Sequence, residues 1–148
     1  MIKTLYAFVW VLAASLLLIT GEVAAKQSNN QATATQASEK ISVLVWGDSL
    51  SAAYGIPQEK GWVSLLQQQF DEQLHVVNAS ISGETTQGGL SRLPDALVRY
   101  KPSLLLLELG ANDGLRGIQT EVMQENLQKM IEMSRDANAQ VVLLGIRI

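Results

Sequence analysis

Residues 41–51 read ISVLVWGDSLS and contain the first predicted strand together with the first candidate functional turn. Residues 41–46 are apolar and rich in β-branched side chains, and the run stops at Gly47, which is typical of a buried strand. The turn that follows holds Ser49 and Ser51. A serine in a tight strand-to-helix turn can be presented as a nucleophile, but it can also simply cap the next helix. Taken alone, the turn favours the cap.

Three further runs predict strands, at residues 74–78, 103–109 and 140–146, and the run 103–109 is typical of a buried strand. Between them, apolar residues recur at helical spacing near residues 61–70, 90–98 and 123–134, with Thr120 as the predicted N-cap of the last helix and Pro94 expected to begin or kink the middle one. Strands and helices therefore alternate along the chain. This order predicts an α/β fold, in which a parallel sheet is covered by helices on both faces.

Residues 1–25 are predicted to form a secretory signal peptide that is cleaved after Ala25. Lys3 supplies the positive start, residues 5–19 are an uncharged apolar run, and Val23 and Ala25 are small residues at the positions that a signal peptidase reads. The alternative is an uncleaved membrane anchor, but the apolar run is short for a span of about 20 residues. Cleavage would leave no membrane span and place the protein in the bacterial periplasm or outside the cell.

The remaining chain divides into a polar linker, residues 26–40, and a folded domain, residues 41–148. The composition excludes several classes. A net charge of −3 rules out a strongly basic nucleic-acid-binding protein. The absence of cysteine rules out disulfides, zinc-thiolate sites and a cysteine nucleophile. With one histidine, His75, a multi-histidine metal site is also excluded, and the sequence predicts neither a metal nor another cofactor.

Small and polar residues follow the second and third predicted strands as well as the first. Gly83 lies in residues 78–85, NASISGET, and Asn112 lies in residues 110–114, GANDG. Because the carboxyl ends of parallel strands meet at one edge of a sheet, these residues are expected to converge on one crevice. Each also has an ordinary interpretation, since Gly83 suits any turn and Asn112 suits an Asx-turn.

The three segments together resemble the SGNH (GDSL-type) hydrolase family. Residues 47–51 match its first block, Gly83 its second, and the G-x-N-D of residues 110–113 its third, in the expected order and spacing. The runs VVNASISGET, RLP and LELGANDGLRG are similar to the periplasmic thioesterase, lysophospholipase and arylesterase branch. The resemblance covers about residues 43–147.

The resemblance implies a flavodoxin-like three-layer α/β/α sandwich and a serine ester hydrolase that needs no metal. Ser49 would be the nucleophile, and the N–H groups of Ser49 and Gly83 would form the oxyanion hole together with the side chain of Asn112. Asp48 and Asp113 would support their loops. The implied substrates are small acyl esters, acyl thioesters and lysophospholipids.

One family motif is not found in these 148 residues. The D-x-x-H that supplies the general base and its orienting acid is missing, and His75 lies at the start of a predicted strand, away from the expected crevice. We therefore expect a C-terminally truncated domain, without the last strand and closing helix, whose activity is impaired. Its fourth strand would be an exposed apolar edge that favours self-association.

The sequence also allows comparison with two other functions. A non-catalytic remnant of the same fold, which binds acyl ligands or a partner, shares every motif and remains open. Nucleotide binding is disfavoured, because the glycines at positions 110, 114 and 117 match neither a dinucleotide-binding motif nor a P-loop.

Overall fold

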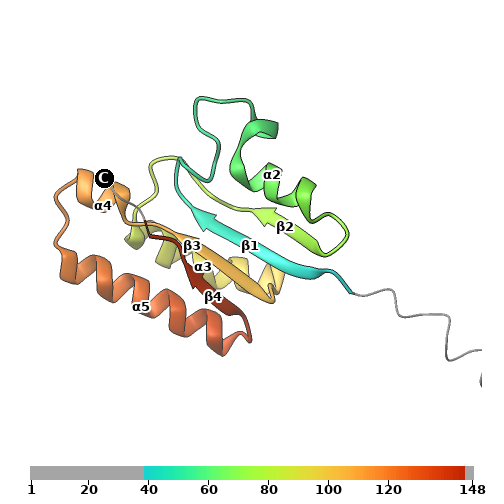
Figure 1. The fold of residues 1–148 in the computed structure, drawn as a ribbon. Coiled ribbons are helices and arrows are strands. Elements are labelled where there is room, and N and C mark those ends of the chain that lie inside the picture. The colour runs from blue at the N-terminus through green and yellow to red at the C-terminus, as the bar shows by residue number, and fades with distance from the viewer. Residues whose placement is uncertain (1–38, 146–148) are drawn as a thin grey trace, which may run out of the picture. The chain divides into compact units, whose positions relative to one another are not determined.

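The computed structural model describes residues 39–145, which contain one four-stranded parallel sheet (Figure 1). The strands are β1 (Ile41–Gly47), β2 (Leu74–Asn78), β3 (Leu104–Glu108) and β4 (Gln140–Leu143), in the spatial order β2-β1-β3-β4. All three pairings are parallel. The predicted signal peptide, most of the predicted linker and residue 146 of the fourth predicted strand lie outside the described residues.

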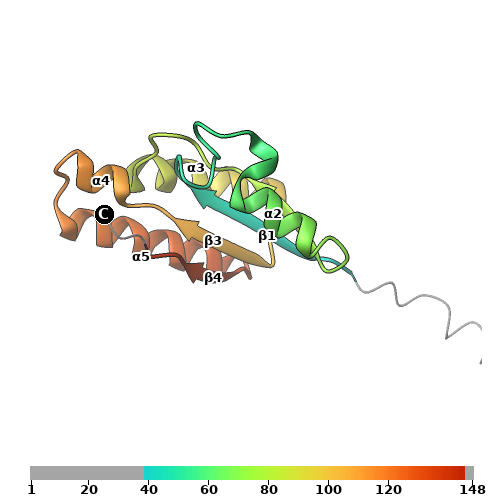
Figure 2. The ribbon, with the colours of Figure 1, turned by 45° about the horizontal axis from the view of Figure 1, so that its top comes forward.

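Helices cover both faces of the sheet. The elements are η1 (Gln58–Lys60), α2 (Trp62–Gln69), α3 (Thr86–Tyr100), α4 (Ala111–Leu115) and α5 (Thr120–Asp136). Helix α2 contacts β2 on one face, whereas α3 and α5 contact each other on the opposite face (Figures 1 and 2). The predicted α/β class, a parallel sheet between two helical layers, is therefore confirmed.

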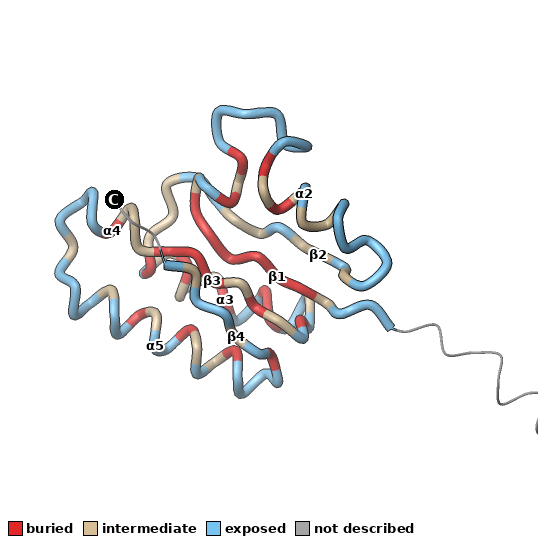
Figure 3. Tube along the Cα trace, in the orientation of Figure 1, coloured by how far each residue is buried: buried red, intermediate tan, exposed pale blue. Residues whose placement is uncertain are grey.

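The core is built on the two central strands, β1 and β3. Residues Val43, Leu44, Val45 and Trp46 of β1 are all at most 1% exposed, because helices cover both faces of the strand. Figure 3 shows the same contrast between the buried central strands and the exposed outer side of α5. Alternate residues of β1 point to opposite faces, so Leu44 and Trp46 join the cluster formed with α3 and α5.

Helix α3 differs from its predicted form. It begins at Thr86 rather than at Pro94, and Pro94 lies inside it. Thr85 caps the helix, since its side chain accepts a hydrogen bond from the Gly88 N–H at 3.3 Å. Pro94 is exposed and lacks only one N–H, a loss that the buried face of the helix, which includes Leu93, offsets.

Several other boundaries also differ. Thr120 is the first residue of α5 and Gln119 is its N-cap, so the predicted cap is wrong by one residue. The fourth strand ends at Leu143, although the Leu144 N–H still donates to the Leu107 carbonyl at 2.9 Å. The short elements η1 and α4 have no counterpart in the prediction, because neither is long enough to show a hydrophobic period.

Between residues 39 and 145 there is no helix with the length and apolar character needed to cross a membrane.

Helix α3 offers a direct test of this packing. Leu93 is fully buried, whereas Val98 on the same helix is 74% exposed. We expect Leu93→Ala to lower the free energy of unfolding by about 2–5 kcal/mol, because it leaves a cavity against the sheet. The control Val98→Ala should change it by less than about 0.5 kcal/mol. Urea unfolding followed by circular dichroism measures both, and similar losses in the two variants would contradict the described core.

Candidate active site

Three loops meet at the carboxyl end of the sheet, and hydrogen bonds link each loop to the other two. Each loop is counted with the last residue of the strand before it, so the first comprises residues 47–57, the second 78–85, and the third 108–119, which includes α4. The Asn78 side chain donates to the Ser51 carbonyl at 2.7 Å, and the Ile81 N–H donates to the Gly47 carbonyl at 3.0 Å. Both bonds hold the segment after β2 against the segment after β1.

The third loop is bonded to both of the others. The Asn112 side-chain amide donates to Asp48 Oδ2 at 2.9 Å, which joins the third loop to the first. The Arg116 guanidinium donates to the Gly83 carbonyl at 2.9 Å. The Thr86 N–H donates to Asp113 Oδ2 at 2.8 Å, and the Thr86 hydroxyl bonds the other oxygen of the same carboxylate. The three predicted motifs are thus parts of one hydrogen-bonded assembly.

Ser49 lies in the first loop and is half-buried. Neither its backbone N–H nor its hydroxyl is bonded to another described residue. The helix-cap interpretation is wrong, because β1 is followed by a series of turns and the next α-helix begins only at Trp62, with Gly61 as its N-cap. The expected strand-to-helix turn is therefore a longer loop. The Ser49 carbonyl accepts the Tyr54 N–H at 3.1 Å, but no hydrogen bond of its side chain to a described residue explains why a serine is present.

Gly83 and Asn112 lie on the other two loops. Gly83 has a φ of 79°, a left-handed backbone conformation that residues other than glycine rarely adopt. Its N–H donates to no described residue. Asn112 is the second residue of α4, so it does not form the Asx-turn considered from the sequence. One N–H of its amide bonds Asp48, which leaves a second N–H for another acceptor.

Asp48 and Asp113 are 1% and 0% exposed, respectively. Asp48 accepts the Leu50 N–H at 3.0 Å as well as the Asn112 amide. Asp113 accepts the two groups of Thr86, whose hydroxyl also accepts the Asn126 side chain at 3.1 Å. Both carboxylates therefore bond groups on a neighbouring segment of the chain.

Sequence reasoning missed a third buried carboxyl group, that of Glu108, the last residue of β3. It is 4% exposed, and its Oε2 accepts the Ser51 hydroxyl at 2.7 Å. Burial raises the pKa of Glu108 above its ordinary value, and the neighbouring Asp48 carboxylate adds to the increase, although the Ser51 bond opposes it. A single acidic residue in the otherwise apolar run of residues 103–109 was the signal that could have identified it.

His75 lies at the opposite end of the sheet from Ser49. It is exposed, it is the second residue of the edge strand β2, and it is paired with Ser42, the second residue of β1. Ser49, by contrast, follows the carboxyl end of β1. In the described range, 39–145, no three His, Asp or Glu side chains are grouped so that they could hold a metal ion.

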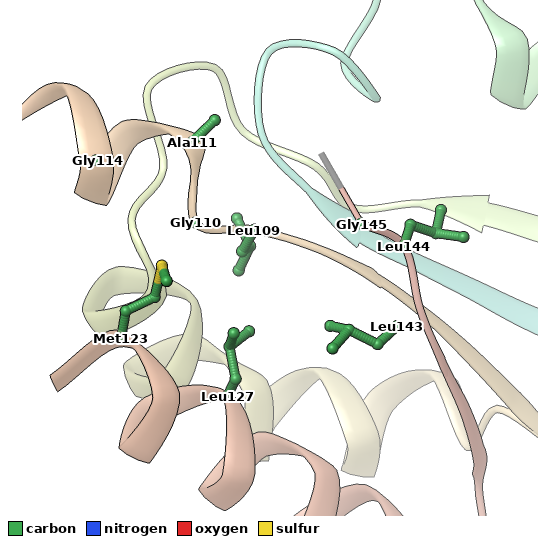
Figure 4. Close-up of a pocket in the computed structure, with 9 residues that line it drawn as sticks. All are labelled: Leu109, Gly110, Ala111, Gly114, Met123, Leu127, Leu143, Leu144 and Gly145. Carbon is green, nitrogen blue, oxygen red and sulfur yellow. The ribbon is translucent and has the colours of Figure 1, made fainter. Parts of the chain in front are cut away.

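An apolar pocket of about 280 Å³ adjoins the third loop. Figure 4 shows Leu109, Leu127 and Leu143 facing a common space between α5 and the strands. The full lining is Leu109, Gly110, Ala111, Gly114, Met123, Leu127, Leu143, Leu144 and Gly145. None of the three candidate residues Ser49, Gly83 and Asn112 lines it, so the pocket lies beside the convergence of the loops and not at its centre.

The arrangement suits chemistry in which negative charge develops on an oxygen. Four groups lie on loops at one edge of the sheet and donate to no described residue: the hydroxyl and N–H of Ser49, the N–H of Gly83 and one amide N–H of Asn112. Such fixed donors stabilise an oxyanion without reorganising during the reaction.

Comparison with known proteins finds a matching family model and similar sequences. Residues 45–148 match the model of the GDSL-like lipase/acylhydrolase family. An arylesterase of Vibrio mimicus is 52% identical over 118 residues, which make up 78% of this chain and 58% of the relative. Thioesterase 1/protease 1/lysophospholipase L1 of Escherichia coli K12 is 43% identical over 106 residues, 72% of this chain and 51% of the relative.

Solved structures share the fold. A crystal structure of TesA has a TM-score of 0.70 and 51% sequence identity, over 72% of this chain and 61% of that chain. The esterase AlinE4, described as a member of the SGNH-hydrolase family, has a TM-score of 0.70 and 32% identity, over 74% of this chain and 60% of that chain. The chain thus spans a little over half the length of the curated relatives it matches.

The raised pKa of Glu108 predicts a pH dependence of stability. The folded state favours the neutral form of Glu108, and this preference stabilises the folded protein. The stabilisation is complete at pH values below the pKa of an unfolded glutamic acid. It is lost as the pH rises through the higher folded pKa. We therefore expect Glu108→Gln to gain stability relative to the unsubstituted chain as the pH rises from about 4 to about 8. Urea unfolding across this range measures the difference. The exposed Glu59→Gln should show no such trend, and a constant difference for Glu108→Gln would contradict the shift.

Proposed function

The chain belongs to the GDSL-like lipase/acylhydrolase family, and we propose from that premise that it is an exported serine ester hydrolase that acts through an acyl-enzyme on Ser49. The observation that supports this most directly is the pairwise bonding of the three loops. This bonding holds four groups at one edge of the sheet: the Ser49 hydroxyl, the N–H groups of Ser49 and Gly83, which donate to no described residue, and the second amide N–H of Asn112.

The proposed reaction has two steps. The Ser49 hydroxyl attacks the carbonyl carbon of the substrate. The carbonyl oxygen becomes negative and accepts hydrogen bonds from the N–H groups of Ser49, Gly83 and Asn112. The carbon–oxygen or carbon–sulfur bond then breaks, and the alcohol or thiol leaves with a proton. Water then attacks the acyl carbon, the bond from that carbon to Ser49 Oγ breaks, and the carboxylic acid is released while the serine oxygen takes back a proton. Small acyl esters, acyl thioesters and lysophospholipids all contain the required carbonyl group.

Proton transfer is the step for which these 148 residues supply no evident group. They contain no D-x-x-H, and the single histidine lies at the amino end of the sheet. The loss of a triad member lowers kcat by several orders of magnitude, although an oxyanion hole preserves part of the rate enhancement. We therefore propose that a polypeptide of this sequence hydrolyses esters slowly.

An external base tests this proposal. We expect imidazole to accelerate hydrolysis of a short-chain nitrophenyl ester by the purified chain at least about tenfold more than by its Ser49→Ala variant, because imidazole takes the serine proton. The variant also corrects for the direct reaction of imidazole with the ester. Absorbance of the released nitrophenolate gives the rate. Equal rates with and without Ser49 would contradict the acyl-enzyme proposal, and calorimetric binding of an acyl ligand without turnover would then favour a binding protein.

We also propose export with cleavage after Ala25, on the basis of the predicted signal peptide. When the full chain is produced in a bacterial cell, we expect the periplasmic form to begin at Lys26, as measured by intact mass spectrometry. Ala25→Phe should block cleavage because a signal peptidase reads that position. The matched control Ala24→Phe, one residue earlier, should not. A full-length chain retained in the membrane fraction would instead support an uncleaved anchor.

A further inference from the structure

The carboxyl group of Glu108 has no role in the proposed acyl transfer, yet it is buried directly beneath the nucleophile loop. Its Oε2 accepts two hydrogen bonds, from the Ser51 hydroxyl at 2.7 Å and from the Asp48 N–H at 3.4 Å. Its Oε1 is also buried and has no partner among the described residues. An acid in such a place loses solvation, so its retention beneath this loop needs an explanation other than stability.

The two donors lie on either side of Ser49. Asp48 precedes it and Ser51 follows it by two residues, and both bond the same oxygen atom of Glu108. Ser49 itself makes no side-chain bond to a described residue, so its position follows from how its neighbours are held. Glu108 therefore holds the loop that contains Ser49 at two points, the Asp48 N–H and the Ser51 hydroxyl.

Gly47 allows this close approach. It is paired with Glu108 across β1 and β3. A Cβ atom at residue 47 would lie 2.7 Å from Glu108 Oε2 and 2.7 Å from Ser51 Oγ, distances at which atoms must move apart. The Glu108 carboxyl group thus occupies space that a side chain at residue 47 would fill. The position of Glu108 therefore requires glycine at residue 47.

The same network reaches the proposed oxyanion donor. Asp48 bonds Glu108 through its backbone N–H, and its side-chain Oδ2 accepts the Asn112 amide at 2.9 Å. A shift of the loop at residue 48 would therefore also move the amide of Asn112. The charged group that faces Glu108 among the described residues is Asp48. Burial raises the pKa of Glu108, the Ser51 hydrogen bond opposes this increase, and the Asp48 carboxylate adds to it.

We propose that Glu108, acting through Ser51 and Asp48, is a positioning residue that holds Ser49 and Asn112 in register for ester hydrolysis. The inference builds on the proposed function, but its structural part can be measured without turnover. The ionised carboxylate accepts both bonds strongly, and protonation weakens them. The geometry of the loop should therefore change as the pH falls through the pKa of Glu108.

Nuclear magnetic resonance of the ¹⁵N-labelled chain tests the structural part. We expect the amide signal of Ser49 and the side-chain amide signals of Asn112 to shift together with one midpoint, set above the ordinary pKa of a glutamic acid. In Glu108→Gln this step should disappear, and both signals should lie away from their positions in the unsubstituted chain. The control Glu59→Gln should retain the step. Signals that titrate identically in all three proteins would overturn the proposal.

Kinetics with imidazole tests the link to hydrolysis. We expect Glu108→Gln and Ser51→Ala each to lower the Ser49-dependent kcat on the order of 10–100-fold with little change in KM, because displacement of the reacting groups affects the transition state more than substrate binding. Ser51→Ala removes only a hydroxyl, so it serves if Glu108→Gln fails to fold. Unchanged kcat in both variants would overturn the positioning role. A chain with no Ser49-dependent rate at all would instead refute the proposed function, while the resonance titration would still decide whether Glu108 positions the loops.

Discussion

Three carboxyl groups are buried at the carboxyl end of the sheet, and the arrangement of the loops depends on how they are satisfied. Asp48, Glu108 and Asp113 are each at most 4% exposed. No Lys or Arg of the described residues forms an ion pair with any of them. Their hydrogen bonds come instead from backbone N–H groups, hydroxyls and an amide. Since an unsatisfied buried carboxylate is very costly, the segments that supply these donors must lie close together.

This choice of donors has a consequence for chemistry. A guanidinium or ammonium group placed among the carboxylates could attract a developing oxyanion. The carboxylates would attract the same positive charge, however, and would neutralise it. Neutral dipoles avoid this competition. The N–H groups of Ser49 and Gly83 donate to no described residue, so they stay available at a fixed position. In the proposed mechanism the buried acids organise the site through geometry, and the N–H groups of Ser49 and Gly83 supply its electrostatics.

The sequence predicts the sheet well and the site only in part. The continuous apolar run of residues 103–109 contains the central strand β3, and the predicted strand 74–78 coincides with the edge strand β2. Pro94 misled the helix boundary, because tertiary contacts of α3 outweigh one missing hydrogen bond. The motifs of Ser49, Gly83 and Asn112 locate the loops, but the bonds to Glu108, Thr86 and Arg116 join residues far apart in the chain. Local periodicity contains no information on such long-range partners.

The polarity of the parallel sheet decides which titratable groups can take part in catalysis. His75 has the appropriate chemistry for a general base, but it is paired with Ser42 at the amino end, the full length of a strand away from Ser49. Glu108 lies at the correct end, but the Ser51 hydroxyl and the Asp48 N–H occupy the same oxygen beneath the loop. His75 therefore lies at the wrong end of the sheet to contact Ser49, and among the described residues no hydrogen bond joins Glu108 to Ser49. In the proposed mechanism the described loops stabilise negative charge, which is a separate task from proton transfer and can be measured separately when the base is supplied from solution.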